Sequence, residues 1–211
     1  MNGFTSKRTG WFALFTGAIG FLALITLLLF FLGFFQDIPS LSSMGNLNDM
    51  TNIFAGFLGA VLASMLHSTL RKLLPHLSLI VLIGVWVGAI AVAFGSWLIQ
   101  TGRADVELSS YYFFLGNGLI GLWLLVLNRT ARQQETWPRN LTQLGSIASF
   151  FMMLGLLALY GIILGLDGSV YSPLIMVTGL SFFGTGILYP VWCLWLGRWI
   201  LSKQADNVIS V

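Results

Sequence analysis

The sequence predicts an all-α integral membrane protein in which six transmembrane helices form one bundle and both termini are cytoplasmic. Three observations support this fold class: the composition, six long apolar runs, and the distribution of basic residues. Hydrophobic residues make up 57% of the chain and charged residues 8%, with a mean hydropathy of +0.88. Soluble domains carry roughly 25% charged residues. A chain so poor in charge cannot cover a water-facing surface, so lipid is its expected solvent.

Each apolar run is long enough to cross a bilayer, which takes about 20 residues in a helix. The first run is longer than the roughly 7–15 apolar residues of a signal peptide, so we expect it to remain as a span. The expected spans are 11–35, 51–70, 77–100, 110–128, 141–166 and 171–201. They nearly exhaust the 211 residues, which predicts a single domain, 1–211, with any function in the bundle or its loops.

The connections define the spans in order. A polar loop from Gln36 to Asp49 follows the first span, and Asp49 and Asn52 suit the N-cap and first turn of the second. The basic stretch 71–76 separates spans two and three, and a loop containing Arg103 separates three and four. The charged connection 129–140 leads into span five, and a short loop around Asp167 leads into span six.

Basic residues fix the orientation, because Lys and Arg favour the cytoplasmic side of short loops. With six spans, every Lys and Arg except Arg103 falls on the side of the termini. One span more or fewer would destroy this segregation. The charge pattern and the span count therefore support each other. Most acidic residues fall on the other side with Arg103: Asp37, Asp49, Asp105, Glu107 and Asp167.

Small residues recur at helical spacing and indicate where helices approach closely. We expect them to build a compact bundle, whether they face the same chain or a second copy. The stripes are Asn52, Gly56, Gly59, Ala63 and His67 in span two; Gly84, Gly88, Ala91 and Gly95 in span three; Gly161 and Gly165 in span five; and Gly179, Gly186, Pro190, Cys193 and Gly197 on one face of span six. Four tryptophans near span ends are expected to anchor the chain at the membrane interfaces: Trp11, Trp97, Trp137 and Trp199.

Two positions inside spans are candidates for a special role. Pro190 removes a backbone donor, so we expect a kink, with Gly186 leaving room for a neighbouring helix. Such breaks line binding sites in some transporters. Asn117 needs a partner in lipid, and we expect an interhelical hydrogen bond, with substrate contact as the alternative.

Several classes of chemistry find no support in the sequence. Every charged residue maps to a loop or a span end, which argues against a pump coupled through a buried carboxylate but not against a facilitator for neutral molecules. HExxH and GxSxG are absent. The single cysteine, Cys193, has no partner within the chain, and no basic patch suggests nucleic acid. We therefore predict no catalytic residue, no metal site and no cofactor.

The two histidines leave one alternative open. His67 and His76 flank the turn between spans two and three, where paired imidazoles could hold a haem or another pigment. An interfacial position without any ligand is the simpler interpretation. A metal ion would need further ligands, and the sequence places no Cys, Asp or Glu near them on that side.

In layout, the chain resembles a bacterial family of uncharacterised six-span membrane proteins. The resemblance rests on FTGAIGFLAL in the first span, NLNDM in the outer loop, the basic turn HSTLRKLLPH, the passage RTARQQETWPRNLTQLGSIASF and the ending WLGRWILSK. Within the fourth of these, Pro138, Arg139, Leu144 and Gly145 match the family's pattern. The resemblance implies the bacterial cytoplasmic (inner) membrane as the location, and it implies no functional residue.

Three functional hypotheses follow. The first is a non-enzymatic structural or accessory component that assembles with itself or with other subunits in the lipid bilayer. The second is a small permease or binder for an apolar or lipid-like ligand, lined by Asn52, Asn117 and the region of Pro190. The third is a redox or pigment-binding subunit that uses His67 and His76.

Overall fold

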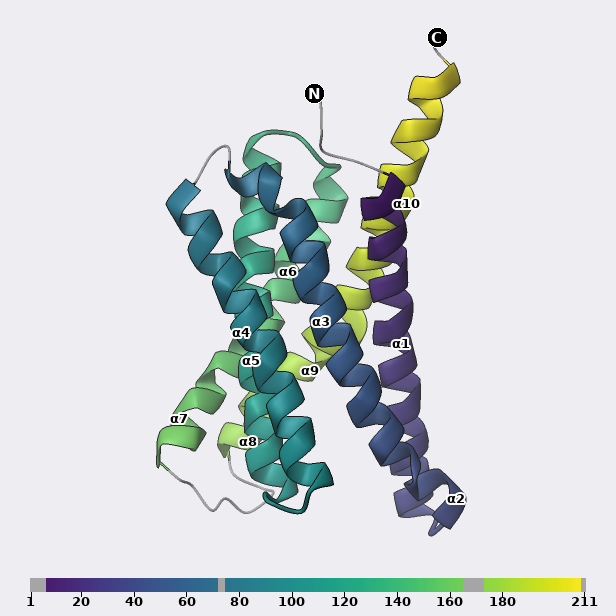
Figure 1. Ribbon diagram of the computed structural model, residues 1–211, viewed down its shortest axis with the longest axis vertical. Coiled ribbons are helices and arrows are strands. Elements are labelled where there is room, and N and C mark those ends of the chain that lie inside the picture. The colour runs from purple at the N-terminus through teal and green to yellow at the C-terminus, as the bar shows by residue number, and fades with distance from the viewer. Residues whose placement is uncertain (1–6, 72–74, 165–172, 210–211) are drawn as a thin grey trace.

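The computed structural model describes residues 7–71, 75–164 and 173–209. Across these residues six helices are long and apolar enough to cross a membrane. This is a polytopic membrane protein with an all-α fold, as the sequence predicts (Figure 1). The elements are α1 (Lys7–Phe35), α2 (Pro39–Ser42), α3 (Met44–Arg71), α4 (Pro75–Gln100), α5 (Val106–Gln133), α6 (Arg139–Met153), the 3₁₀ turn η1 (Leu154–Leu157), α7 (Ala158–Leu164), α8 (Pro173–Gly179), α9 (Ser181–Phe183), the π-helical turn η2 (Gly184–Leu188) and α10 (Tyr189–Ile209).

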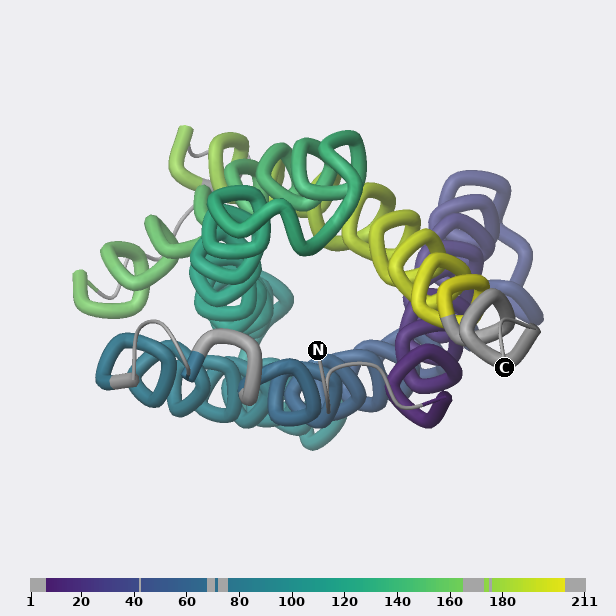
Figure 2. Tube along the Cα trace, turned by 90° about the horizontal axis from the view of Figure 1, so that it is seen from above, coloured from purple at the N-terminus to yellow at the C-terminus, as the bar shows by residue number. Residues whose placement is uncertain are grey.

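The helices form a ring in chain order. Each of α1, α3, α4, α5 and α6 packs beside the next, and α10 closes the ring between α6 and α1 (Figure 2). α1 begins and α10 ends at the same end of the bundle, which we call the terminal end; the opposite end is the distal end (Figure 1). Large apolar side chains of α1 and α4, such as Leu28 and Ile80, are exposed on the outside, where lipid would cover them.

The second span begins earlier than its sequence indicates. Ser43 has helical backbone angles and joins α2 directly to α3, which starts at Met44. Asp49 and Asn52 therefore lie inside α3, and the expected N-cap at Asp49 is wrong because the chain is already helical there. Asp105, by contrast, does cap a helix: its carboxylate accepts a hydrogen bond from the Leu108 amide at 2.8 Å.

The last two spans are interrupted. Span five changes from α6 through η1 to α7, and span six passes through α8, α9 and η2 before α10. The π-helical turn lies immediately before Pro190, where the sequence predicts a break. Gly179 precedes the break, and a Cβ there would meet nothing within 4 Å, whereas Gly197 packs against α1. The expected single small-residue face of span six is therefore wrong, because the helical register changes along it.

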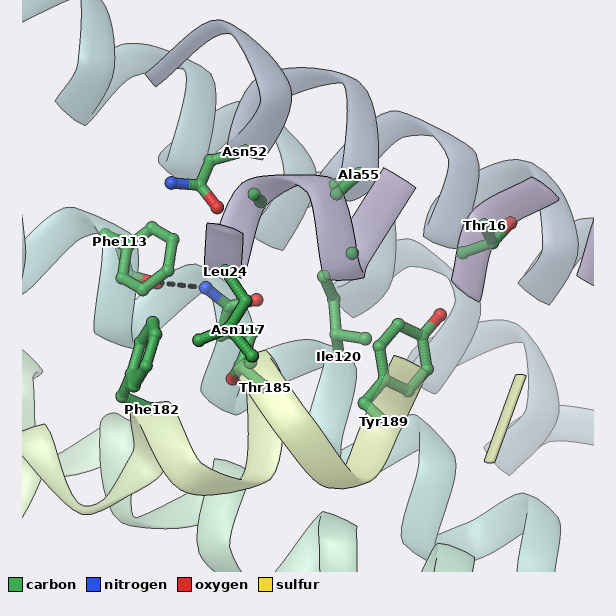
Figure 3. A pocket seen from close by; sticks show the side chains of 14 residues that line it. Thr16, Leu24, Asn52, Ala55, Phe113, Asn117, Ile120, Phe182, Thr185 and Tyr189 are labelled. Atoms are coloured by element: carbon green, nitrogen blue, oxygen red, sulfur yellow. Dashed lines mark hydrogen bonds between the residues drawn. The ribbon is translucent and has the colours of Figure 1, made fainter. Parts of the chain in front are cut away.

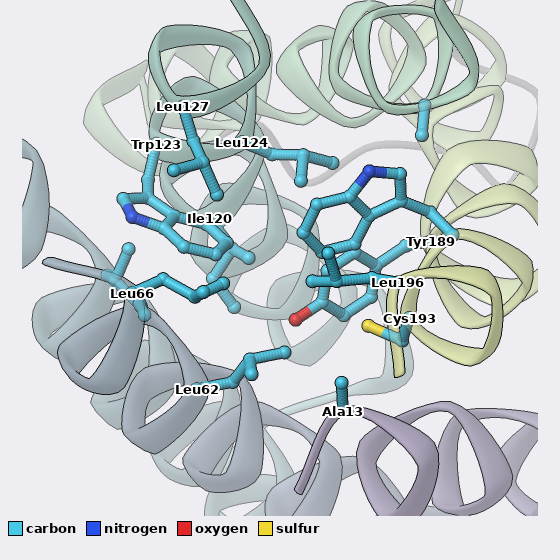
Figure 4. Packing of buried hydrophobic residues seen from close by; sticks show 14 of the residues in the cluster. Ala13, Leu62, Leu66, Ile120, Trp123, Leu124, Leu127, Tyr189, Cys193 and Leu196 are labelled. Atoms are coloured by element: carbon cyan, nitrogen blue, oxygen red, sulfur yellow. The ribbon is translucent and has the colours of Figure 1, made fainter. Parts of the chain in front are cut away.

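Large aromatic side chains pack among aliphatic ones in the buried core of the bundle (Figure 4). The Trp192 ring stacks on Tyr189, with centroids 6.0 Å apart, and meets Trp123 edge-on at 6.4 Å. Trp137 packs on the same ring at 6.0 Å and is only 5% exposed. We call these four residues the aromatic core. Trp137 is thus not an interface anchor, because the connection before α6 folds it inward onto Trp192.

The small-residue stripes mainly serve contacts within the chain. A Cβ on Gly88 of α4 would lie 2.5 Å from the Gly116 carbonyl of α5, and one on Gly197 would lie 2.7 Å from the Gly10 carbonyl of α1. A Cβ on Gly161 would meet the Tyr111 ring at 2.7 Å. Helices approach this closely in membranes because small residues let backbones touch. These glycines therefore hold neighbouring spans of one chain together.

Candidate functional site

A small cavity of about 30 Å³ lies between α1, α3, α5 and the broken sixth span (Figure 3). That volume suits one or two water molecules, since one water occupies roughly 10–15 Å³ on this measure. The described residues that line it are all uncharged, and most are apolar or glycine. Five of them have polar side chains: Thr16, Asn52, Asn117, Thr185 and Tyr189.

The cavity brings together the two amides that the sequence singles out. Asn52 comes from α3 and Asn117 from α5, and Figure 3 shows both beside the same space. Asn117 is only 6% exposed, and its amide nitrogen donates to the Phe113 carbonyl at 2.9 Å. The expected interhelical hydrogen bond is therefore wrong, because the amide bonds back one turn within α5. The Asn117 Oδ1 atom and the Asn52 side chain make no hydrogen bond among the described residues.

Tyr189 adds a hydroxyl that no pattern in the sequence marks as special. Its side chain is only 7% exposed, and the hydroxyl oxygen has no conventional hydrogen-bond partner among the described residues. The thiol of Cys193, one turn further on, is its polar neighbour and is only a weak hydrogen-bonding group. The hydroxyl lies opposite Gly59, where a Cβ would approach it to 3.1 Å. Tyr189 is thus a buried hydroxyl at the cavity wall.

Pro190 shapes the cavity without lining it. Its ring packs on α1, where a Cβ at Gly20 would lie 2.7 Å from the proline Cγ. In η2 the Tyr189 amide donates to the Gly184 carbonyl, five residues back. The Thr185 carbonyl thereby loses its α-helical donor, and Pro190 has no N–H to replace it. Neither the α-helical nor the π-helical donor is thus available to this carbonyl, in a turn that contributes Thr185 and Gly186 to the cavity wall.

The sequence predicts that Gly186 leaves room for a neighbouring helix, and this prediction is wrong. A Cβ there would lie 2.8 Å from the ring of Phe182, four residues earlier in the same span. The aromatic ring folds back over the glycine and occupies the space that a second helix would need. Gly184 instead receives the neighbour, because a Cβ there would lie 2.8 Å from the Ala148 carbonyl of α6.

The two histidines lie apart from this cavity. His67 is half-buried near the end of α3, and its Nδ1 atom has no hydrogen-bond partner in the described part of the chain. His76 is exposed at the start of α4. Among the residues that the structure describes, no three His, Cys, Asp or Glu side chains could together hold a metal ion.

A comparison with protein families, curated proteins and solved structures finds no match to this chain. The chain therefore has no family assignment.

Proposed function

We propose that this protein is a membrane-embedded binding protein for a small, uncharged molecule that forms hydrogen bonds, with Asn52 and Asn117 as its principal contacts. The observation behind the proposal is the cavity, in which amides from two helices keep unused hydrogen-bonding groups. An unpaired polar group is costly in a lipid environment, because no water is present to replace the missing partner. A ligand would supply these groups with partners.

The lining supports an uncharged ligand. A charged ligand would need a countercharge in so apolar a setting, and none of the described lining residues is Asp, Glu, Lys, Arg or His. π-Helical turns are often found at functional sites, and η2 contributes Thr185 and Gly186 to the wall. This sharpens the sequence-based hypothesis of an apolar or lipid-like ligand toward a smaller and more polar one.

The size and position of the cavity favour binding over an open pore. Its volume admits one or two water-sized groups, so a larger ligand requires a wall to move. α1 lines the cavity with two small residues, Gly20 and Ala23, beside Thr16 and Leu24. The aromatic core and the buried aliphatic side chains around it close the bundle on the terminal side of the cavity. Transport would therefore require those rings to separate.

The hypothesis of an accessory subunit gains no support from the glycine stripes. Gly88, Gly161 and Gly197 contact helices of the same chain, so they are occupied before any second copy could approach. Gly84 is open, but one open glycine does not define a contact surface.

The test compares substitutions of the two cavity asparagines with one of an exposed asparagine. Asn117→Leu keeps the approximate volume but removes the amide from the cavity, and Asn140→Leu alters an exposed asparagine at the start of α6. The purified proteins are probed in detergent with acetamide, ethanol, glycerol and urea by saturation-transfer NMR. We expect at least one probe to receive saturation from the wild type and from Asn140→Leu, with a loss of at least about fivefold in Asn117→Leu and in Asn52→Leu. Equal signals from all four proteins would contradict the proposal.

A further inference from the structure

A second candidate site lies at the terminal end, on the outer edge of the contact between α1 and α10. The two helices touch there through glycine: a Cβ on Gly10 would lie 2.9 Å from Leu201, and one on Gly197 would lie 2.7 Å from Leu14. The start of α1 and the last turns of α10 therefore run side by side at the terminal end (Figure 1).

Each helix places one basic residue on the edge of this contact. Lys7 shares a helix face with Leu14, two turns further along α1, and Leu14 packs against α10. Arg198 lies between Leu194 and Leu201 at helical spacing, and both leucines pack against α1. Lys7 and Arg198 are nevertheless exposed, so their side chains emerge from the edge of the contact on the outside of the bundle.

An exposed tryptophan lies one turn deeper than each of these cations. Trp11 follows Lys7 by four residues and is 63% exposed, and Trp195 precedes Arg198 by three residues and is 40% exposed. Tryptophan prefers the headgroup level of a bilayer. Below Trp11, the exposed apolar side chains of α1 continue with Phe15. The order from the end inward is therefore cation, indole and apolar chain.

Neither cation has a counterion among the side chains that the structure describes. No ion pair involves Lys7 or Arg198 among the described residues, and the one acidic side chain described at this end, Glu135, belongs to the connection between α5 and α6. Two cations on touching helices repel each other, and an anion between them would remove that cost. The guanidinium of arginine suits a phosphate oxygen pair in particular.

We propose that the edge formed by Lys7, Trp11, Trp195 and Arg198 binds the phosphate of an anionic phospholipid. The phosphate lies between the two cations, the indoles flank the glycerol region, and the acyl chains follow the apolar outside of α1. The tryptophans select a lipid over free phosphate, because a soluble anion would leave both indoles without a contact. This site is separate from the cavity and does not depend on the function proposed for it.

The test measures thermal unfolding of the purified protein in detergent by tryptophan fluorescence. The probes are phosphatidylglycerol, phosphatidylcholine with the same acyl chains, and inorganic phosphate. We expect phosphatidylglycerol to raise the Tm by several degrees more than phosphatidylcholine, and inorganic phosphate to leave it unchanged. The double variant Lys7→Gln/Arg198→Gln should lose this difference. Arg129→Gln/Arg132→Gln, which removes equal charge at the same end on α5, should keep it.

Three results would overturn the proposal: equal shifts from both lipids, an equal loss in both double variants, or a shift reproduced by inorganic phosphate alone. Lys7 also belongs to the basic start of the first span, so the double variant could fail to insert. The single variant Arg198→Gln then tests the proposal, because it leaves the basic start of the first span intact. It should lose most of the phosphatidylglycerol shift, while Arg198→Lys should retain part of it.

Discussion

Asn128 shows how a single buried amide positions the aromatic core. It is fully buried, its Nδ2 atom donates to the Leu124 carbonyl at 2.8 Å, and its Oδ1 atom accepts from the Trp192 indole at 3.2 Å. Gly145 of α6 packs directly against this amide, where any side chain would collide with it. The sequence marks Asn128 only as the end of span four, because its partner lies 64 residues away. Long-range pairing of this kind leaves no local pattern.

Asn128→Ala should therefore destabilise the protein by about 1–3 kcal/mol, because it leaves the buried Trp192 N–H without an acceptor. Asn140→Ala is the control, since Asn140 is exposed near the same end of the bundle. The free energy of unfolding of each variant is measured by titrating SDS into the protein in a mild detergent. Equal values for the two variants would show that the Trp192 hydrogen bond contributes nothing to stability.

At the scale of an element, the small-residue stripe of α4 shows which features of helix packing can be predicted from sequence and which cannot. Gly84 and Gly88 lie one turn apart on the same face of α4, yet of the two only Gly88 touches α5. The periodicity shows that small residues share a face, but the direction of that face depends on how six helices pack. The same limit applies to the last two spans. Pro190 predicts a break, whereas η1 in span five contains no proline, and its Gly155 packs against the Phe114 carbonyl of α5.

The two glycines of α4 give a matched pair of substitutions. Gly88→Ala should destabilise the protein by about 1–3 kcal/mol, because its Cβ would overlap the Gly116 carbonyl and neither backbone can move freely. Gly84→Ala should be neutral within about 0.5 kcal/mol or slightly stabilising, because its Cβ meets nothing within 4 Å and alanine favours a helix. SDS unfolding measures both variants. A loss at Gly84 as large as that at Gly88 would indicate a contact outside this chain.

For the whole molecule, composition and hydropathy predict the fold class, and the structure confirms six long apolar helices. Only part of the candidate site could be predicted from the sequence. Asn52 and Asn117 stand out because amides are rare in apolar spans, and the cavity does contain both. Tyr189 was missed because a tyrosine in an apolar run usually packs with its hydroxyl satisfied, and only coordinates show that the Cys193 thiol is the polar neighbour of this one among the described residues.

The orientation of the molecule in its membrane is the remaining prediction at this scale. α1 begins and α10 ends at the same end of the bundle (Figure 1), and the described basic residues other than Arg103 lie at that end. Because Lys and Arg resist translocation, we predict that the terminal end is cytoplasmic. Reporter fusions at residue 135 and after the last residue should both read cytoplasmic, and a fusion at residue 104 should read external. An external signal at residue 135 would mean that the bundle has the opposite orientation in the membrane. The same sidedness at residues 104 and 135 would mean that α5 does not cross the membrane.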